Sequence, residues 1–312
     1  MRKRNNIKLN YIMNTILTLS SFIFPLITFP YVSRILLPEG TGRVSFATSL
    51  VSYFLMLSQL GIPTYGIRAC AKVRDDRRKL SRVVHELMAI NLVMSLLSYL
   101  ALGIFVFAIP RLRAESSLIF IISLTILLNA VGMEWLYKAL EQYTYITIRS
   151  VIFKAIAVVA MLLLIRQQSD YVVYGALTIL AASASNVCNF VHAHTYIDLF
   201  PEEKYNYRQH MKPILVFFAM SCATVIYTNL DTVMLGLMKS NVDVGYYNAA
   251  VKIKGILVGI VTSLGTVMLP RLSYYVERGE MEEFQRLTKK AMNFVILLAT
   301  PMMIYFILFA EE

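Results

Sequence analysis

Charged residues are scarce in this sequence of 312 residues. Asp, Glu, Lys and Arg make up 16% of it, against about a quarter in a soluble domain, whereas hydrophobic residues reach 57%. The apolar residues form long blocks, each close to the roughly 20 residues that a helix needs to cross a bilayer. This composition excludes a soluble globular protein, and the ten-residue alternation of a membrane β-barrel is absent. We therefore expect an all-α integral membrane protein, because helices satisfy their own backbone hydrogen bonds in hydrocarbon.

Cysteine is rare as well. Cys70, Cys188 and Cys222 stand apart, with neither CxxC nor metal-ligand spacing, so the sequence supports neither a disulfide framework nor a zinc site. His192 and His194 have no carboxylate or cysteine at ligand spacing, and we assign them no metal. Hydrolase, kinase and dinucleotide motifs are absent. We therefore predict no catalytic residue, no metal, no cofactor and no enzyme activity.

The apolar blocks predict about nine membrane spans. Their expected positions are 10–32, 44–66, 86–109, 116–137, 150–165, 171–191, 213–236, 246–270 and 291–310. The basic start of the chain, from Met1 to Arg4, leads into the first block without a small-residue cleavage site after it. We interpret this block as a retained first span and not as a signal peptide.

The formal net charge is +11, which raises the question of a nucleic-acid partner. The placement of the charge argues against one. If the N-terminus is cytoplasmic, the predicted spans put 22 of the 30 Lys and Arg inside, Arg149 and Lys154 included, and six outside. This bias is typical of plasma membrane proteins, so we predict a cytoplasmic N-terminus and a basic face toward anionic lipid headgroups.

Two similar hexapeptides indicate an internal repeat. Gly42-Arg-Val-Ser-Phe-Ala opens the second predicted span, and Gly245-Tyr-Tyr-Asn-Ala-Ala opens the eighth, 203 residues later. Six spans separate the copies, which preserves their orientation and predicts a parallel repeat about an axis along the membrane normal. We expect a complete six-helix lobe at 1–196 and a partial three-span lobe at 197–312. The sequence would then be truncated relative to two full lobes.

Charges within the predicted spans are candidates for function, because a charge at mid-bilayer costs about 2.5–3.5 kcal/mol on insertion scales. Asp231 and Lys252 are expected roughly 8–9 Å below the outer surface, at 1.5 Å per residue, so they could pair across two helices. An ion pair that only holds two helices together explains these charges as well as a role in a transport cavity does. Asn229 lies near Asp231, and Asn248 shares a helical face with Lys252.

Three other charged residues are candidates with alternatives. Arg34 ends the first span after Pro25 and Pro30, and such broken helices line transporter cavities, although an interfacial anchor explains Arg34 equally well. Glu134 lies four residues before Lys138, so a local ion pair accounts for it as well as function does. Arg68 is the third candidate, at the end of one of the motifs described next.

Five stretches resemble the signatures of the polysaccharide-export flippases, which serve O-antigen, capsule and similar repeat units. The most specific is FPYVSRILLPEGTGRVSFA at 29–47. The others are LGIPTYGIR at 60–68, EWLYKALE at 134–141, DTVMLG at 231–236 and VGYYNAA at 244–250. The resemblance covers essentially the whole chain. One departure is Lys138-Ala139, where the family usually has Gln-Gly.

The resemblance implies two bundles of six helices around a central cavity, related to the multidrug and toxic compound extruders and the lipid II flippase. It implies alternating access, a bacterial plasma membrane location and a polyprenyl diphosphate cargo that carries a few sugars. Polysaccharide polymerase and glycosyltransferases would be partners beside the membrane lipids. In this interpretation Arg34 and Lys252 hold the diphosphate through charge-assisted hydrogen bonds, Asp231 holds Lys252 while the cavity is empty, and Asn229 and Asn248 face the sugars.

Two rival functions are weighed against this one. A multidrug or cation antiporter of the same fold would need an unpaired carboxylate deep in the first lobe, and the first predicted span has no acidic residue. A membrane glycosyltransferase or polymerase would need a catalytic outside loop, and the predicted outside loops are only about 6–13 residues long.

Overall fold

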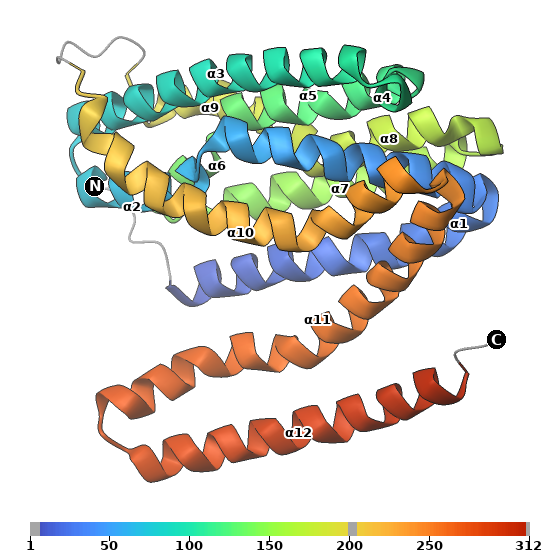
Figure 1. Ribbon diagram of the computed structural model, residues 1–312. Helices are drawn as coiled ribbons and strands as arrows, with labels where there is room; N and C mark the ends of the chain where they lie inside the picture. The colour runs from blue at the N-terminus through green and yellow to red at the C-terminus, as the bar shows by residue number, and fades with distance from the viewer. Residues whose placement is uncertain (1–6, 199–204, 310–312) are drawn as a thin grey trace. The chain divides into compact units, whose positions relative to one another are not determined.

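The computed structural model describes residues 7–198 and 205–309, apart from the side chains of 7, 8, 256 and most of 259–277 (Figure 1). The described residues are almost entirely helical and contain no strand. They form two compact units, residues 1–248 and 249–312. The helices of the first unit are α1 (Ile7–Gln59), α2 (Ile62–Val73), α3 (Arg77–Ala108), α4 (Pro110–Ala114), α5 (Ser116–Gly132), α6 (Glu134–Ala139), α7 (Tyr143–Leu164), α8 (Tyr171–Ile179), α9 (Asn186–His192), α10 (Arg208–Met238) and the first residues of α11 (Asn241–Glu277).

Six helical segments of the described chain are long and apolar enough to cross a membrane. The first, Leu9–Val73, holds two predicted spans, and α5 adds a shorter apolar helix. The predicted span 246–270 falls within α11, where most side chains from 259 onward lie outside the described residues. Large apolar side chains are exposed on α3, such as Leu96 at 63% and Ile104 at 68%, as lipid contact requires. The chain is a multi-pass membrane protein of the all-α class, as predicted.

A break divides α1 into two arms. Leu37 has φ 57° and ψ 177°, outside the helical region, and Pro38 follows it. Proline lacks an N–H and disfavours a helical residue before it, so two helices meet here. The two predicted spans at 10–32 and 44–66 are therefore separate, but the second arm ends at Gln59 and not at 66. Leu60 and Gly61 turn the chain with positive φ before α2 begins.

The start of α7 corrects a predicted boundary. The fifth span was expected at 150–165, which is only 16 residues, whereas α7 begins at Tyr143 and has 22 residues. Arg149 and Lys154, which the charge count placed on the cytoplasmic side, both lie within this helix, and their side of the membrane stays a prediction. Lys154 is the twelfth of the 22 residues and is at the middle of α7.

The sixth predicted span, 171–191, is one helical rod with an irregular centre. A π-turn at Leu180–Ala184 joins α8 to α9. Polar side chains attach this region to α5, because Asn189 donates to the carbonyl of Gly132 at 2.6 Å and Asn129 donates to the Ser183 hydroxyl at 3.1 Å. Gly132 is required for this approach, since a Cβ there would lie 2.5 Å from the Asn186 side chain.

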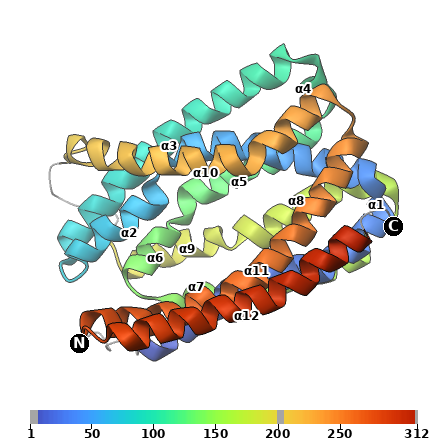
Figure 2. The ribbon, with the colours of Figure 1, turned by 60° about the horizontal axis from the view of Figure 1, so that its bottom comes forward.

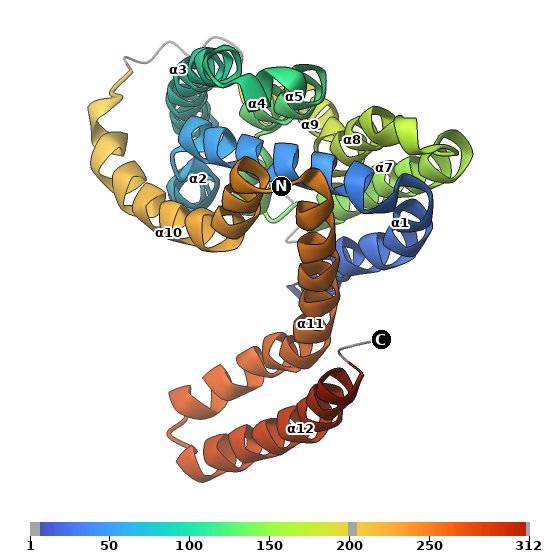
Figure 3. The same cartoon turned by 45° about the vertical axis from the view of Figure 1, so that its right-hand side comes forward.

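The helices of the first unit meet at two ends, named here the α2 end and the α4 end. The α2 end holds α2, α6, the end of α9 and the start of α10, and the α4 end holds α4, the start of α8 and the turn from α10 to α11 (Figure 1). One apolar cluster is built on α1, α3, α5 and α8, and a second is built on α2, α3 and α6 at the α2 end. The helix α10 packs against the second arm of α1 and against α2 (Figure 3).

The second unit is a helical hairpin. It consists of α11 from residue 249 onward and α12 (Met281–Leu308), joined by a turn at Gly279, whose φ is 71° (Figure 2). The predicted ninth span, 291–310, corresponds to α12, which begins ten residues earlier. The predicted lobe boundary between 196 and 197 stays a prediction. It falls just before the residues 199–204, which lie outside the described part of the chain.

Candidate functional site

Arg34 lies on the first arm of α1, three residues before the break at Leu37. Its side chain is exposed, and among the described residues it has no hydrogen-bond or ion-pair partner. An unpaired guanidinium at the end of a broken helix can bind an external anion. The interfacial anchor that the sequence left open is equally compatible with this position.

Asp231 has a partner that the sequence did not predict. The Tyr247 hydroxyl donates to its Oδ2 at 2.6 Å, so the start of α11 is bonded to α10 across their turn. Lys252, its predicted partner, belongs to the second unit, and the pair of Asp231 with Lys252 stays a prediction. Asn248, also a candidate, donates to the carbonyl of Val244 within α11 at 3.0 Å.

Asn229 lines an uncharged polar cavity between α10, the second arm of α1 and α2. The cavity has a volume of about 300 Å³, and its described walls contain no charged side chain. They consist of Ser52, Leu55, Met56, Gln59, Gly61, Pro63, Thr64, Ser221, Val225 and Asn229. Hydroxyl and amide groups of this kind both donate and accept hydrogen bonds, as a sugar requires.

The helix α7 carries two cations that sequence reasoning did not select as candidates. The ammonium of Lys154 donates to the hydroxyls of Ser20 and Ser21 on α1, at 2.8 and 2.9 Å. No carboxylate of the described chain lies within ion-pair distance of it. The signal that could have found Lys154 was its own position, because it lies inside the fifth predicted span, 150–165.

Arg149 is a second missed cation, and it is 7% exposed. Its Nη1 donates to the Ser185 carbonyl at 2.8 Å, and its Nη2 lies 3.9 Å from Glu134. Glu134 is already paired with Lys138 at 2.7 Å, so the local pair that the sequence suggested is present. One carboxylate therefore serves two cations here, and Arg149 Nε has no partner in the described structure.

Arg68, the remaining candidate, is exposed at the α2 end. Its guanidinium lies over the Phe217 ring, 4.9 Å from the ring centroid. This cation–π contact connects α2 to α10 and accounts for Arg68 without a ligand.

The α4 end is closed by a hydrogen-bonded network between α4 and the turn from α10 to α11. Arg111 of α4 donates to the carbonyls of Gly236 and Lys239 and to Asn241 Oδ1, at 3.1–3.2 Å. The Ser240 hydroxyl donates to Asp243 and holds the pKa of this carboxyl below its ordinary range. These bonds satisfy carbonyls that the end of α10 would leave without partners.

The two copies of the predicted repeat meet at this closed end. A Cβ on Gly42 would lie 1.8 Å from the Asn241 carbonyl oxygen, and a Cβ on Gly245 would lie 1.9 Å from the Pro38 carbonyl oxygen. Only glycine permits such contact between two backbones. The hexapeptides at 42 and 245 thus share a structural role, which is the close approach of α1 and α11.

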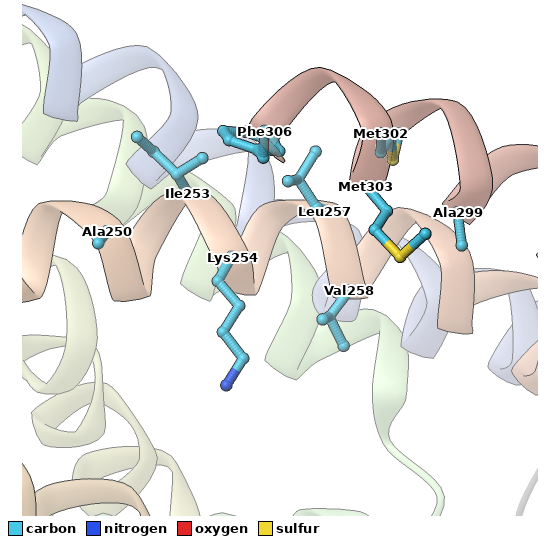
Figure 4. Close-up of a pocket in the computed structure, with 9 residues that line it drawn as sticks. All are labelled: Ala250, Ile253, Lys254, Leu257, Val258, Ala299, Met302, Met303 and Phe306. Carbon is cyan, nitrogen blue, oxygen red and sulfur yellow. The ribbon is translucent and has the colours of Figure 1, made fainter. Parts of the chain in front are cut away.

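The second unit contains an apolar groove of about 550 Å³ between α11 and α12 (Figure 4). Its charged residue is Lys254, which points away from Met302 and Phe306. The groove is lined by Ala250, Ile253, Lys254, Leu257, Val258, Ala299, Met302, Met303 and Phe306. Such walls suit hydrocarbon and offer almost nothing to a phosphate or a sugar.

Within the described residues, no group of three His, Cys, Asp or Glu could hold a metal ion. His192 is instead part of an aromatic stack, with its ring 4.5 Å from that of Tyr145. His194 faces the carbonyl of Val191.

The comparisons with known proteins agree with one another. The family model described as "Polysaccharide biosynthesis protein" matches residues 7–276. A protein of Escherichia coli (strain K12) named "Putative O-antigen transporter" is 21% identical over 271 residues, which cover 86% of this chain and 65% of that protein. A protein of Shigella dysenteriae with the same name is 26% identical over 266 residues, which cover 81% of this chain and 64% of that protein.

The chain thus spans about two thirds of the length of these relatives, or slightly less. No solved structure matches it. The family match extends from the first helix through nearly all of α11 and includes the sequence stretches that carried the resemblance. The chain therefore belongs to the polysaccharide biosynthesis protein family.

Proposed function

We propose that this chain moves a lipid-linked oligosaccharide across a bacterial plasma membrane by alternating access. The cargo would be a polyprenyl diphosphate with a few sugars attached. The similarity to two proteins named as O-antigen transporters supports transport of this class of molecule. We place the N-terminus in the cytoplasm, and we expect glycosyltransferases and a polymerase to supply and use the cargo.

The observation that carries the proposal is the position of Lys154. An ammonium at the middle of a membrane helix is costly, and here two serine hydroxyls are its partners, with no carboxylate of the described chain within ion-pair distance. A serine pair solvates the charge without cancelling it. The charge thus remains available to an anion, which is what a diphosphate in a water-poor cavity needs.

The rest of the site fits the same cargo. Ser20 and Ser21 lie near the middle of the first arm of α1, and Arg34 lies close to the end of the same arm. Cations are therefore found at two depths along this arm. The uncharged cavity at Asn229 offers hydroxyl and amide groups to sugars. We propose that Arg34 and Lys154 bind the diphosphate in turn, that Lys252 also binds it, and that Asn229 and Asn248 bind sugar hydroxyls.

The alternative of a cation antiporter has less support. It requires a carboxylate without a partner, deep in the first lobe. The two most buried carboxylates of the described first lobe both have cationic partners, Glu86 with Arg82 at 3.0 Å and Glu115 with Arg43 at 3.1 Å. The site is therefore better suited to an anion than to a cation.

Reconstituted transport tests the proposal. The purified chain is placed in vesicles with a polyprenyl diphosphate that carries a fluorescent disaccharide, and a membrane-impermeant lectin reports the movement of the sugar. Lys154→Met should slow the movement by about tenfold to a hundredfold, because a hydrogen bond to a charged group contributes about 1.5–3 kcal/mol. Lys154→Arg should retain part of the rate.

The matched control is Lys239→Met, which removes an exposed cation at the α4 end and should leave the rate unchanged. The amount of folded protein per vesicle is measured for each variant. Movement by Lys154→Met at the wild-type rate would overturn the assignment, and a folded wild-type chain that moves none of the lipid would overturn the function.

A further inference from the structure

A buried polar cluster at the α2 end joins α10 to α2 and α3. Its centre is the carboxylate of Glu86 on α3, which is 0% exposed. His210 of α10 is 3% exposed, and its Nε2 lies 2.6 Å from Glu86 Oε2. On the other side of the imidazole, the Tyr65 hydroxyl of α2 lies 2.8 Å from Nδ1. The proposed movement of cargo assigns no role to these three residues.

The hydrogen-bond donors around Glu86 determine which ring nitrogen of His210 carries a hydrogen. Arg82 Nε lies 3.0 Å from Oε1, the backbone N–H of Asn206 donates to the same oxygen, and Gln209 Nε2 lies 2.9 Å from Oε2. An ionised carboxylate accepts hydrogen bonds and donates none. His210 must therefore donate to it from Nε2–H, and the nitrogen that can gain or lose a proton is Nδ1.

In the described part of the chain, the other charges near the imidazole are few. On α2 the titratable groups are Tyr65 and the Cys70 thiol near it, and on α3 they are Glu86 and Arg82. His85 of α3 is bonded to Tyr205, and Arg208 and Lys212 of α10 are exposed. Because Arg82 balances Glu86, a proton on Nδ1 adds one positive charge next to the carboxylate.

We propose that His210 is a proton-binding site that controls how firmly α10 is held to α2 and α3. Without the proton, the Tyr65 hydroxyl donates to Nδ1. When Nδ1 binds a proton from water, Nδ1–H donates to the Tyr65 oxygen and the tyrosine hydrogen turns away. The imidazolium then attracts the Glu86 carboxylate in addition to its hydrogen bond. Acid therefore tightens the attachment of α10, and alkali loosens it.

The consequence for transport rests on the proposed function. In alternating access, α10, the first helix of the predicted second lobe, must separate from the first lobe at one end while the other end stays closed. A proton taken up at His210 would favour the state in which the α2 end is closed. The predicted orientation puts this end in the cytoplasm, so proton release there would accompany its opening.

Cys70 reports on this attachment. It is fully buried in an apolar cluster that also contains Ile214 of α10, so loosening of α10 exposes its thiol. In the purified full chain with Cys188→Ser and Cys222→Ser, the rate of Cys70 alkylation by N-ethylmaleimide is measured between about pH 5.5 and about pH 8. The same series is measured with His210→Gln. The ratio of the two rates at each pH cancels the changing fraction of reactive thiolate.

The ratio of the wild-type rate to the His210→Gln rate should fall about fivefold from the alkaline to the acid end, as a strengthened hydrogen bond predicts. The control His85→Gln removes a neighbouring histidine outside the cluster and should keep the full pH response. A constant ratio would overturn the proposal. Glu86→Gln gives a second measurement, since it removes the attracting carboxylate, and a pH response that persisted there would also overturn it.

No cargo is present in this experiment. A constant ratio would therefore remove the proton site and leave the transport proposal intact. A failure of transport by the wild-type chain would leave the measured pH response of Cys70 unaffected.

Discussion

Lys154 and Gly42 show how single residues are constrained in this protein. Lys154, at the middle of α7, donates to two hydroxyls of the neighbouring arm. Gly42 has the opposite constraint, since the backbone of Asn241 occupies the space that a side chain would take.

Gly42→Ala should destabilise the protein. Its new Cβ would lie 1.8 Å from a backbone carbonyl oxygen, which cannot rotate aside as a side chain can. Overpacking of this kind costs about 1–3 kcal/mol. Thermal unfolding of the purified chain in detergent measures the loss.

Gly103→Ala is the control for this substitution, because a Cβ added to Gly103 on α3 would have no other atom within 4 Å. It should be neutral or stabilising by up to about 1 kcal/mol, as alanine is the better helix former. Equal melting temperatures for the two variants would contradict the close contact of α1 with the start of α11.

At the scale of elements, α10 is attached to the rest of the first unit at both of its ends. At the α2 end the attachments are the hydrogen bonds to Glu86 and Tyr65, which run through the titratable His210. At the α4 end they come from Arg111, which stays charged at all ordinary pH values. Of the two attachments, the one at the α2 end is therefore the one that protons can adjust.

Arg111→Ala should loosen the turn between α10 and α11, because it removes three hydrogen bonds to Gly236, Lys239 and Asn241. Each such bond contributes about 0.5–1.5 kcal/mol, so hydrogen exchange of the amides at 236–245 should speed up by about tenfold or more. Arg113→Ala on the same short helix is the control, since Arg113 donates to Phe107 instead. Unchanged exchange in Arg111→Ala would show that packing alone holds the turn.

For the molecule as a whole, the sequence was sufficient to predict the class and the approximate spans, because blocks of apolar residues are a strong signal. It was also sufficient for the pairing of Glu134 with Lys138, which follows from their spacing of four in one helical stretch. The family followed from the motifs at 29–47 and elsewhere.

Contacts between distant elements could not be predicted in this way. The pairing of Glu86 with His210 joins residues 124 positions apart, and neither stands out in its own helix. Arg149 was missed because polar residues at 143–149 hid the first turns of α7, whereas Lys154 lay inside the predicted span and was counted with the cytoplasmic charges. Asp231 received Tyr247 as a partner because the turn from α10 to α11 brings these two side chains together.

The orientation of the whole molecule is the last prediction. The positive-inside bias places the α2 end in the cytoplasm and the α4 end outside. Cys70 is a poor reporter of this, since its thiol is fully buried and would resist a reagent on either side. Two exposed cations at opposite ends are better, namely Arg78 beside α2 and Lys239 after α10. In a background with all three native cysteines changed to serine, Lys239→Cys should react with an impermeant maleimide in intact cells, and Arg78→Cys should react only after the membrane is permeabilised. The reverse pattern would invert the topology, and with it the side on which His210 takes up its proton.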